Sequence, residues 1–161
     1  MKWFSCILLI VFLILFSGCE KEIVNENEKG KTEEATIVDE DEKDEALTIA
    51  EAQLVEDGTP ILVKAYIVAS TTRSIKNADF EKPFSGSSAI VLGDKPVEEE
   101  TIYYVDEVFP VCLTDRSKAR AALNLEDNPD NWNHLIYIYG VKEHYMNMDG
   151  MKKVDYWEII P

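Results

Sequence analysis

The chain has 161 residues, which is enough for one ordinary domain with appendages but too short for two. Its apolar content of 46% suffices for a packed core, and its formal net charge is −15. Affinity for nucleic acid comes mostly from Lys and Arg side chains that displace condensed counterions, so this charge argues against nucleic acid as a partner.

The N-terminus has the pattern of a secretory signal peptide. Lys2 precedes an apolar run from Trp3 to Phe16, which is shorter than the roughly 20 residues that a helix needs to cross a bilayer. The sequence "FSGC" then resembles a bacterial lipobox, and this resemblance implies that residues 1–18 are removed and that Cys19 is lipidated. Its acyl chains would anchor the protein in a membrane. The alternatives are an ordinary signal peptide or an uncleaved anchor, with Cys19 incidental.

Residues 20–46 have the composition of a flexible tether. They carry 12 acidic and 4 basic side chains and no aromatic residue, so they bury too little apolar area to offset the entropy of ordering. We therefore expect an acidic tether over residues 19–46 and a folded domain over residues 47–161. The acidic start after Cys19 is similar to the export signal of some surface lipoproteins. We expect the bacterial cell envelope as the location, at the outer membrane, with exposure on the cell surface left open.

The folded domain is predicted to be mainly β. Thr48 and Glu51 have the spacing of a capping box and predict a short N-terminal helix. Runs rich in β-branched and aromatic residues predict five strands, and Asp149-Gly150 predicts the hairpin turn between the last two. The predicted strands begin near Ile61, Ala89, Val108, His134 and Lys152, a second helix lies within residues 115–125, and residues 70–88 form a polar loop.

Five strands with a helix between the third and the fourth follow the order of the OB-fold, a small Greek-key barrel. The stretch "RAALNLEDNPDNWNHLIYIYG" (residues 120–140), together with Tyr66-Ile67-Val68, carries a closer likeness. It resembles a family of uncharacterised bacterial extracytoplasmic proteins with an OB-like domain, related to the N-terminal OB-like region of a secreted, sugar-non-specific nuclease. The resemblance covers about residues 47–160. It implies a fold and no catalytic residues.

No set of residues in the sequence points to catalysis or to a metal. His134 and His144 lie on one predicted strand at a separation of about 33 Å, which is too far to share a metal ion. The stretch "EDNPDNWN" offers oxygen ligands that calcium accepts, but a capped turn is the favoured interpretation. Cys112 lies in an apolar run and fits a structural thiol. We expect no enzymatic activity, no metal and no cofactor.

An aromatic strand face is the remaining candidate for a binding site. The alternation in "LIYIYG" places the isoleucines on one face and Tyr137 and Tyr139 on the other. If the isoleucines fill the barrel, the tyrosines lie outside, near Tyr156 or Trp157 on the paired last strand, where flat rings can stack on a sugar or a base. The alternative is that these tyrosines pack on the barrel wall or beneath the N-terminal helix.

The sequence therefore predicts a lipid-anchored, envelope-facing OB-like module that binds a ligand or a partner and is not itself an enzyme. An oligosaccharide or a protein is the expected partner, besides the membrane that the lipid reaches. Two alternatives stay open. One is an accessory domain that presents nucleic acid or oligosaccharide to a hydrolase, and the other is a structural subunit of an envelope assembly.

Overall fold

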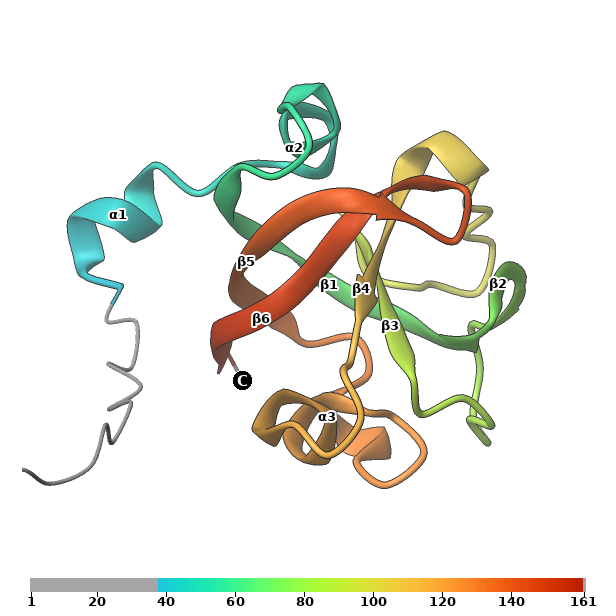
Figure 1. Ribbon diagram of the computed structural model, residues 1–161. Coiled ribbons are helices and arrows are strands. Elements are labelled where there is room, and N and C mark those ends of the chain that lie inside the picture. Colours follow the sequence, from blue (N-terminus) through green and yellow to red (C-terminus); the bar gives the residue numbers. More distant parts are fainter. Residues whose placement is uncertain (1–37, 161) are drawn as a thin grey trace, which may run out of the picture. The chain divides into compact units, whose positions relative to one another are not determined.

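The computed structural model describes residues 38–160 (Figure 1). The predicted signal peptide, the predicted lipidation site Cys19 and most of the predicted tether lie outside these residues. Among residues 38–160, no helix is long and apolar enough to cross a membrane. The elements are α1 (Glu40–Asp44), α2 (Ile49–Leu54), β1 (Pro60–Thr72), β2 (Ser74–Asp79), β3 (Ala89–Gly93), η1 (Val105–Glu107), β4 (Val108–Cys112), α3 (Lys118–Leu123), η2 (Pro129–Asn131), β5 (Leu135–Tyr145) and β6 (Met148–Ile160).

Five of the strands close into a barrel in the order β1-β3-β4-β6-β5, and β5 returns to pair with β1. The pairings are antiparallel except that between β4 and β6, which is parallel. α3 lies in the connection between β4 and β5, which are the third and fourth barrel strands. The predicted five-stranded OB-like barrel, with one helix before it and one between strands three and four, is confirmed.

The barrel core follows from the two-residue period of the strands. β5 turns Ile136 and Ile138 inward, where neither side chain is exposed, and Phe109 of β4 is equally buried. α2 and α3 cover opposite ends of the barrel (Figure 1) and contribute Ile49 and Leu123 to the same cluster. Burying a large apolar side chain of this kind stabilises a fold by about 1.5–3 kcal/mol, so this cluster accounts for much of the driving force for closure.

The capping box predicted at the start of α2 is present. The Thr48 hydroxyl accepts a hydrogen bond from the backbone N–H of Glu51, and the Glu51 carboxylate accepts one from the N–H of Thr48. Just before this helix, Leu47 forms a parallel bridge to β1. Its N–H donates to the carbonyl of Leu62 at 2.9 Å, and its carbonyl accepts from the N–H of Lys64 at 3.0 Å.

The prediction of a plain polar loop over residues 70–88 is wrong. Within it, β2 forms a hairpin with the end of β1 through Arg73, whose φ is 63°. The sequence of β2, "SIKNAD", has few β-branched or aromatic residues, so its composition gives no strand signal. It forms a strand because the end of β1 offers an unpaired edge beside it.

The hairpin between β5 and β6 also turns at a different place from the prediction. Met146 and Asn147 are the turn residues, with φ values of 54° and 64°, as a type I′ turn requires. Asp149 and Gly150 instead lie within β6. Gly150 is needed there because a Cβ at this position would lie 2.6 Å from the carbonyl oxygen of Pro110.

A short helix lies before residue 47, within the predicted tether. Asp39 and Glu42 form a capping box that starts α1 within the predicted tether. Lys43 then forms an ion pair with Glu158 of β6, with 2.6 Å between Nζ and Oε2. α1 buries no side chain of its own. A prediction based on apolar burial therefore misses a helix that is held in place by charge.

Candidate functional site

The predicted alternation on β5 is present in the structure. Ile136 and Ile138 face the core, whereas Tyr137 and Tyr139 are partly exposed on the other side of the strand. Tyr139 pairs with Tyr156 across the β5–β6 ladder. Cross-strand partners share a face of the sheet, so the tyrosine face consists of Tyr137, Tyr139 and Tyr156.

Of the two candidates on the last strand, Tyr156 belongs to this face and Trp157 does not. Its ladder partner is Ile138, which points into the core, and Trp157 packs against that core cluster. The sequence placed the aromatic pair 156–157 on the last strand but left its register open. A shift of one residue moves a side chain to the opposite face of a sheet.

Two lysines cover the ring of Tyr137. The ammonium groups of Lys43 and Lys64 lie 5.8 and 5.3 Å from its centroid. Hydrogen bonds from Lys43 to Glu158 and to Glu40 raise the pKa of this lysine above its ordinary value. α1 therefore lies over part of the tyrosine face, and Tyr139 beside it lines a groove of about 280 Å³.

The stretch "EDNPDNWN" forms a capped turn, which is the interpretation that the sequence analysis favoured. The side-chain amides of Asn124, Asn128 and Asn131 donate to carbonyls of α3 at 2.7, 2.9 and 2.8 Å. These donors satisfy carbonyls that a helix C-terminus leaves without partners. His134 precedes β5, and His144 lies near its far end. Within residues 38–160, no group of three or more His, Cys, Asp or Glu residues is placed to hold a metal ion.

A second hydrophobic cluster lies outside the barrel wall, and sequence reasoning missed it. Val91 of β3 and Val108 of β4 point away from the barrel core and are buried. In OB-folds, the face of the second and third strands, here β3 and β4, together with the flanking loops, is where oligosaccharides and oligonucleotides bind. Here the chain itself covers this face with Tyr66, Ile75, Ala78, Phe80, Val97, Tyr103 and Met148.

The ring of Tyr103 is the centre of this cover. It stacks on Phe80 with a centroid separation of 5.5 Å and an interplanar angle of 13°. It also lies directly over Gly93 of β3, where a Cβ would be only 2.8 Å from the ring atom Cε1. Its hydroxyl donates a hydrogen bond to the carbonyl of Lys95. An aromatic ring of the protein thus occupies the face on which an OB-fold ligand would stack.

Tyr103 belongs to the connection between β3 and β4, residues 94–107, which we call the covering segment. It is held at both ends. Near its start, the Asn133 amide exchanges two hydrogen bonds with the backbone of Val97, at 2.7 and 2.8 Å. Near its end, the Gln53 amide of α2 donates to the carbonyl of Asp106 at 3.1 Å. Asn133 is the last residue of the stretch "EDNPDNWN", and here it positions the covering segment.

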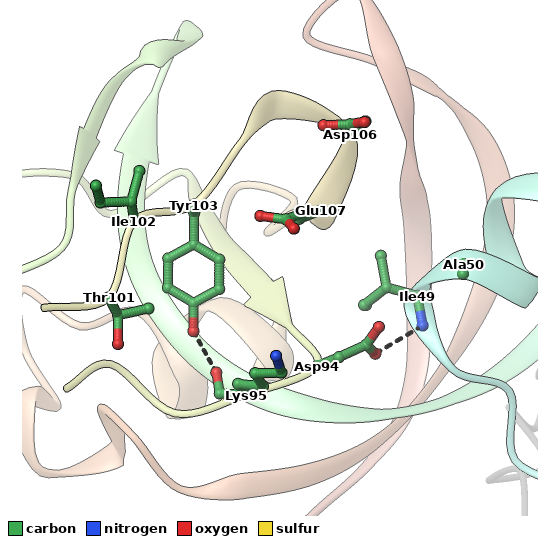
Figure 2. A pocket seen from close by; sticks show the side chains of 9 residues that line it. All are labelled: Ile49, Ala50, Asp94, Lys95, Thr101, Ile102, Tyr103, Asp106 and Glu107. Atoms are coloured by element: carbon green, nitrogen blue, oxygen red, sulfur yellow. Dashed lines mark hydrogen bonds between the residues drawn. The ribbon is translucent and has the colours of Figure 1, made fainter.

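A pocket of about 490 Å³ opens between the covering segment, the end of β3 and the start of α2 (Figure 2). Asp94 Oδ1 accepts a hydrogen bond from the N–H of Ile49 at 3.0 Å. Glu107 Oε2 accepts one from the N–H of Tyr104 at 3.0 Å. These bonds fix two carboxylates at the pocket. Its lining is Ile49, Ala50, Asp94, Lys95, Thr101, Ile102, Tyr103, Asp106 and Glu107.

The pocket has a negative potential. Burial, together with the carboxylates of Glu107, Asp94 and Glu98, raises the pKa of Tyr103 to about 12. Burial and nearby negative charge both disfavour the phenolate form. Of these two causes, only the nearby negative charge would favour a cation entering this space, because burial disfavours any charged group.

Apolar side chains project into solvent beside the pocket. Ile102 is 73% exposed, Tyr104 65% and Val105 61%. Single exposed apolar residues are common on protein surfaces, but neighbouring ones often mark contact sites. The sequence did hold a signal for them. "TIYYV" is a run of β-branched and aromatic residues that directly follows three glutamates.

The closed strand order, the position of α3 and the covered face define an OB-like barrel domain. The chain belongs to the family described as DUF6359, a domain of unknown function, whose model matches residues 47–160. Among solved structures, the hypothetical protein ygiW from E. coli is similar over 71% of this chain and 89% of its own, with 11% identity and a TM-score of 0.42. A comparison with curated proteins found no match.

Proposed function

We propose that this protein is a lipid-anchored OB-like binding module of the bacterial cell envelope that holds a ligand or partner without transforming it. The pocket beside the exposed side chains of Ile102 and Tyr104 is the observation that carries the proposal. Binding sites are typically concave and apolar, with a few polar groups that fix orientation. The covering segment supplies both features on a closed barrel that positions them.

The proposed anchor rests on the lipobox-like sequence before Cys19. We expect Cys19→Ala to abolish incorporation of labelled palmitate and to release the protein from the membrane or leave its signal uncleaved. Cell fractionation and acyl labelling of the wild type and the variant measure this. Cys112→Ala is the matched control and should be lipidated normally. Unlabelled wild-type protein that still needs detergent for extraction would refute lipid anchoring.

Binding is tested by titrating the full-length protein with defined ligands. The panel consists of oligosaccharides, single-stranded DNA and short peptides of either charge. Any ligand that binds should protect the covering segment from hydrogen exchange, because the pocket is built from it. Saturable binding that leaves exchange in residues 94–107 unchanged would move the site elsewhere. Turnover of a bound ligand would overturn the proposal that the module performs no chemistry.

A second candidate is oligosaccharide binding at the tyrosine face, in service of a hydrolase. The resemblance to a nuclease region suggests an accessory domain that serves a hydrolase, and the net charge of −15 favours a sugar over nucleic acid as its ligand. The groove of about 280 Å³ beside Tyr139 favours it, since tyrosine rings can stack on sugars. Replacement of Tyr139 by Ser should then weaken oligosaccharide binding and leave the melting temperature almost unchanged. An equal effect of Ile102→Ser would assign the oligosaccharide to the first site.

A further inference from the structure

We propose that the pocket beneath the covering segment receives a lysine or arginine side chain of a partner protein, while Ile102 and Tyr104 contact apolar residues that flank this cation. The proposal rests on the binding function inferred above. It identifies the partner as a basic segment with interspersed apolar residues. Space, charge and exposed apolar surface support it in turn.

The charges that line the pocket do not balance. Asp94, Asp106 and Glu107 supply three carboxylates, and Lys95 is the one cation in the lining. Within residues 38–160, none of these three carboxylates takes part in a salt bridge. Each therefore retains lone pairs for a guest cation.

Some carboxylates elsewhere on the domain are paired. Glu143 contacts both Lys152 and Lys153 at 3.1 Å, and Asp57 contacts Lys142 at 2.7 Å. The domain thus has cations available, but they are not placed at the pocket. What distinguishes the pocket is that three carboxylates without a salt bridge line one cavity, and a partner with the opposite charge would complement them.

The exposed apolar side chains beside the pocket further restrict the class of partner that fits. A bare metal ion or a polyamine would leave Ile102 and Tyr104 exposed, with no gain from their surface. Nucleic acid and anionic lipid headgroups would be repelled by the carboxylates. A second copy of this chain would bring another strongly negative surface, since the net charge is −15. A basic and apolar protein segment satisfies both parts of the site.

The geometry suits entry of a long side chain. The pocket volume of about 490 Å³ exceeds the space that one lysine or arginine side chain needs, and Ile102 in its lining is largely exposed to solvent. Lysine and arginine can bury their aliphatic stems against apolar surface while the charged head meets carboxylates. Ile49 and Ile102 in the lining offer that surface (Figure 2).

The test uses the full-length protein in non-ionic detergent and a labelled synthetic peptide of alternating lysine and leucine. Fluorescence anisotropy at low salt measures binding, and the signal from detergent without protein is subtracted. A peptide with glutamate in place of lysine tests the charge, and one with serine in place of leucine tests the apolar contacts. We expect measurable affinity for the first peptide only.

Variants assign the binding to the pocket. Asp106→Asn removes one exposed carboxylate and should weaken the lysine–leucine peptide by about two- to fivefold, the range of an exposed ion pair. Ile102→Ser should weaken it at least as much. Glu126→Gln removes another exposed carboxylate, shortly after α3 and away from the pocket, and should have no effect. Equal losses in Asp106→Asn and Glu126→Gln would show nonspecific attraction to an acidic protein and overturn the proposal.

The remaining outcomes separate this inference from the function on which it rests. If the basic peptide fails to bind but an oligosaccharide or single-stranded DNA protects residues 94–107 from exchange, the partner class is wrong and the binding module stands. If Ile102→Ser instead abolishes self-association in sedimentation, the occupant is a second copy. If it abolishes attachment of the Cys19→Ala protein to phosphatidylglycerol vesicles, the occupant is a membrane. Either result overturns the basic partner.

Discussion

Replacing Gly93 by Ala tests whether Tyr103 covers the outer face of β3. The new Cβ would lie 2.8 Å from Cε1 of Tyr103 and 3.2 Å from Cγ1 of Val68. The first distance is too short for two carbon atoms, so one side must move. β3 is held by strands on both sides, whereas the ring belongs to a surface connection. We expect the ring to leave.

The cost can be worked from the contacts that the ring loses. The stack on Phe80 is worth about 0.5–1.5 kcal/mol. The hydrogen bond to the Lys95 carbonyl contributes about 0.5–1.5 kcal/mol. Against this, alanine restricts the unfolded chain and returns about 0.4–1 kcal/mol. At the middle of these ranges the net loss in unfolding free energy is about 1.3 kcal/mol, which lowers the melting temperature by roughly 5 °C for a domain of this size.

Thermal melts and a tyrosine titration check this together. In the wild type the pKa of Tyr103 is raised to about 12, and a displaced ring should titrate near the ordinary value of 10.0. The control is the same glycine replacement made in a Tyr103→Ala background, where no ring is left to clash. A Gly93→Ala cost that persists unchanged in that background would refute the reasoning, as would wild-type stability of the single variant.

Three further predictions concern other parts of the fold. Gly150→Ala should destabilise more than Gly93→Ala in urea unfolding, because the obstacle is the Pro110 carbonyl at 2.6 Å, a backbone atom. The Lys142 ammonium holds the pKa of Asp57 below its ordinary value of 3.8. The pair therefore stabilises the fold above pH 3.8, and this contribution is lost as the pH falls through the lowered pKa. In the Asp57→Asn variant, the unfolding free energy should fall less steeply with decreasing pH than in the wild type. Tyr137→Ser should lower the unfolding free energy by about 1–2 kcal/mol in urea, since it removes two cation–π contacts, and an unchanged midpoint would favour a ligand role for the ring.

The barrel could be predicted because its signals are local and repeat. The alternation around Ile136 and Ile138 and the capping box at Thr48 each depend on residues close in sequence. The hairpin turn was misplaced because Asp149-Gly150 is the stronger turn signal. Position 150 requires glycine because it lies close to the Pro110 carbonyl of β4. That contact cannot be predicted until the order of the strands in the sheet is known.

The candidate site could not be predicted for a similar reason. Tyr103 meets Phe80, and Asp94 meets Ile49, only after the chain has closed the barrel. The tyrosine face was found because its members alternate on one strand. The covering segment shows no such alternation. Its ring at Tyr103 fits against β3 because Gly93 has no side chain, and the sequence alone does not indicate that these two residues meet.

The single bridge at Leu47 also determines how the domain behaves towards other chains. The first half of β1 pairs with β5 on one side. On the other side, Leu47 forms hydrogen bonds with the carbonyl of Leu62 and the N–H of Lys64. A chain shortened to begin at Thr48 would leave these groups open as a free strand edge, which is a template for strand addition. Such a chain should keep its barrel yet aggregate with time, so the few residues before α2 act as protection against assembly into fibres.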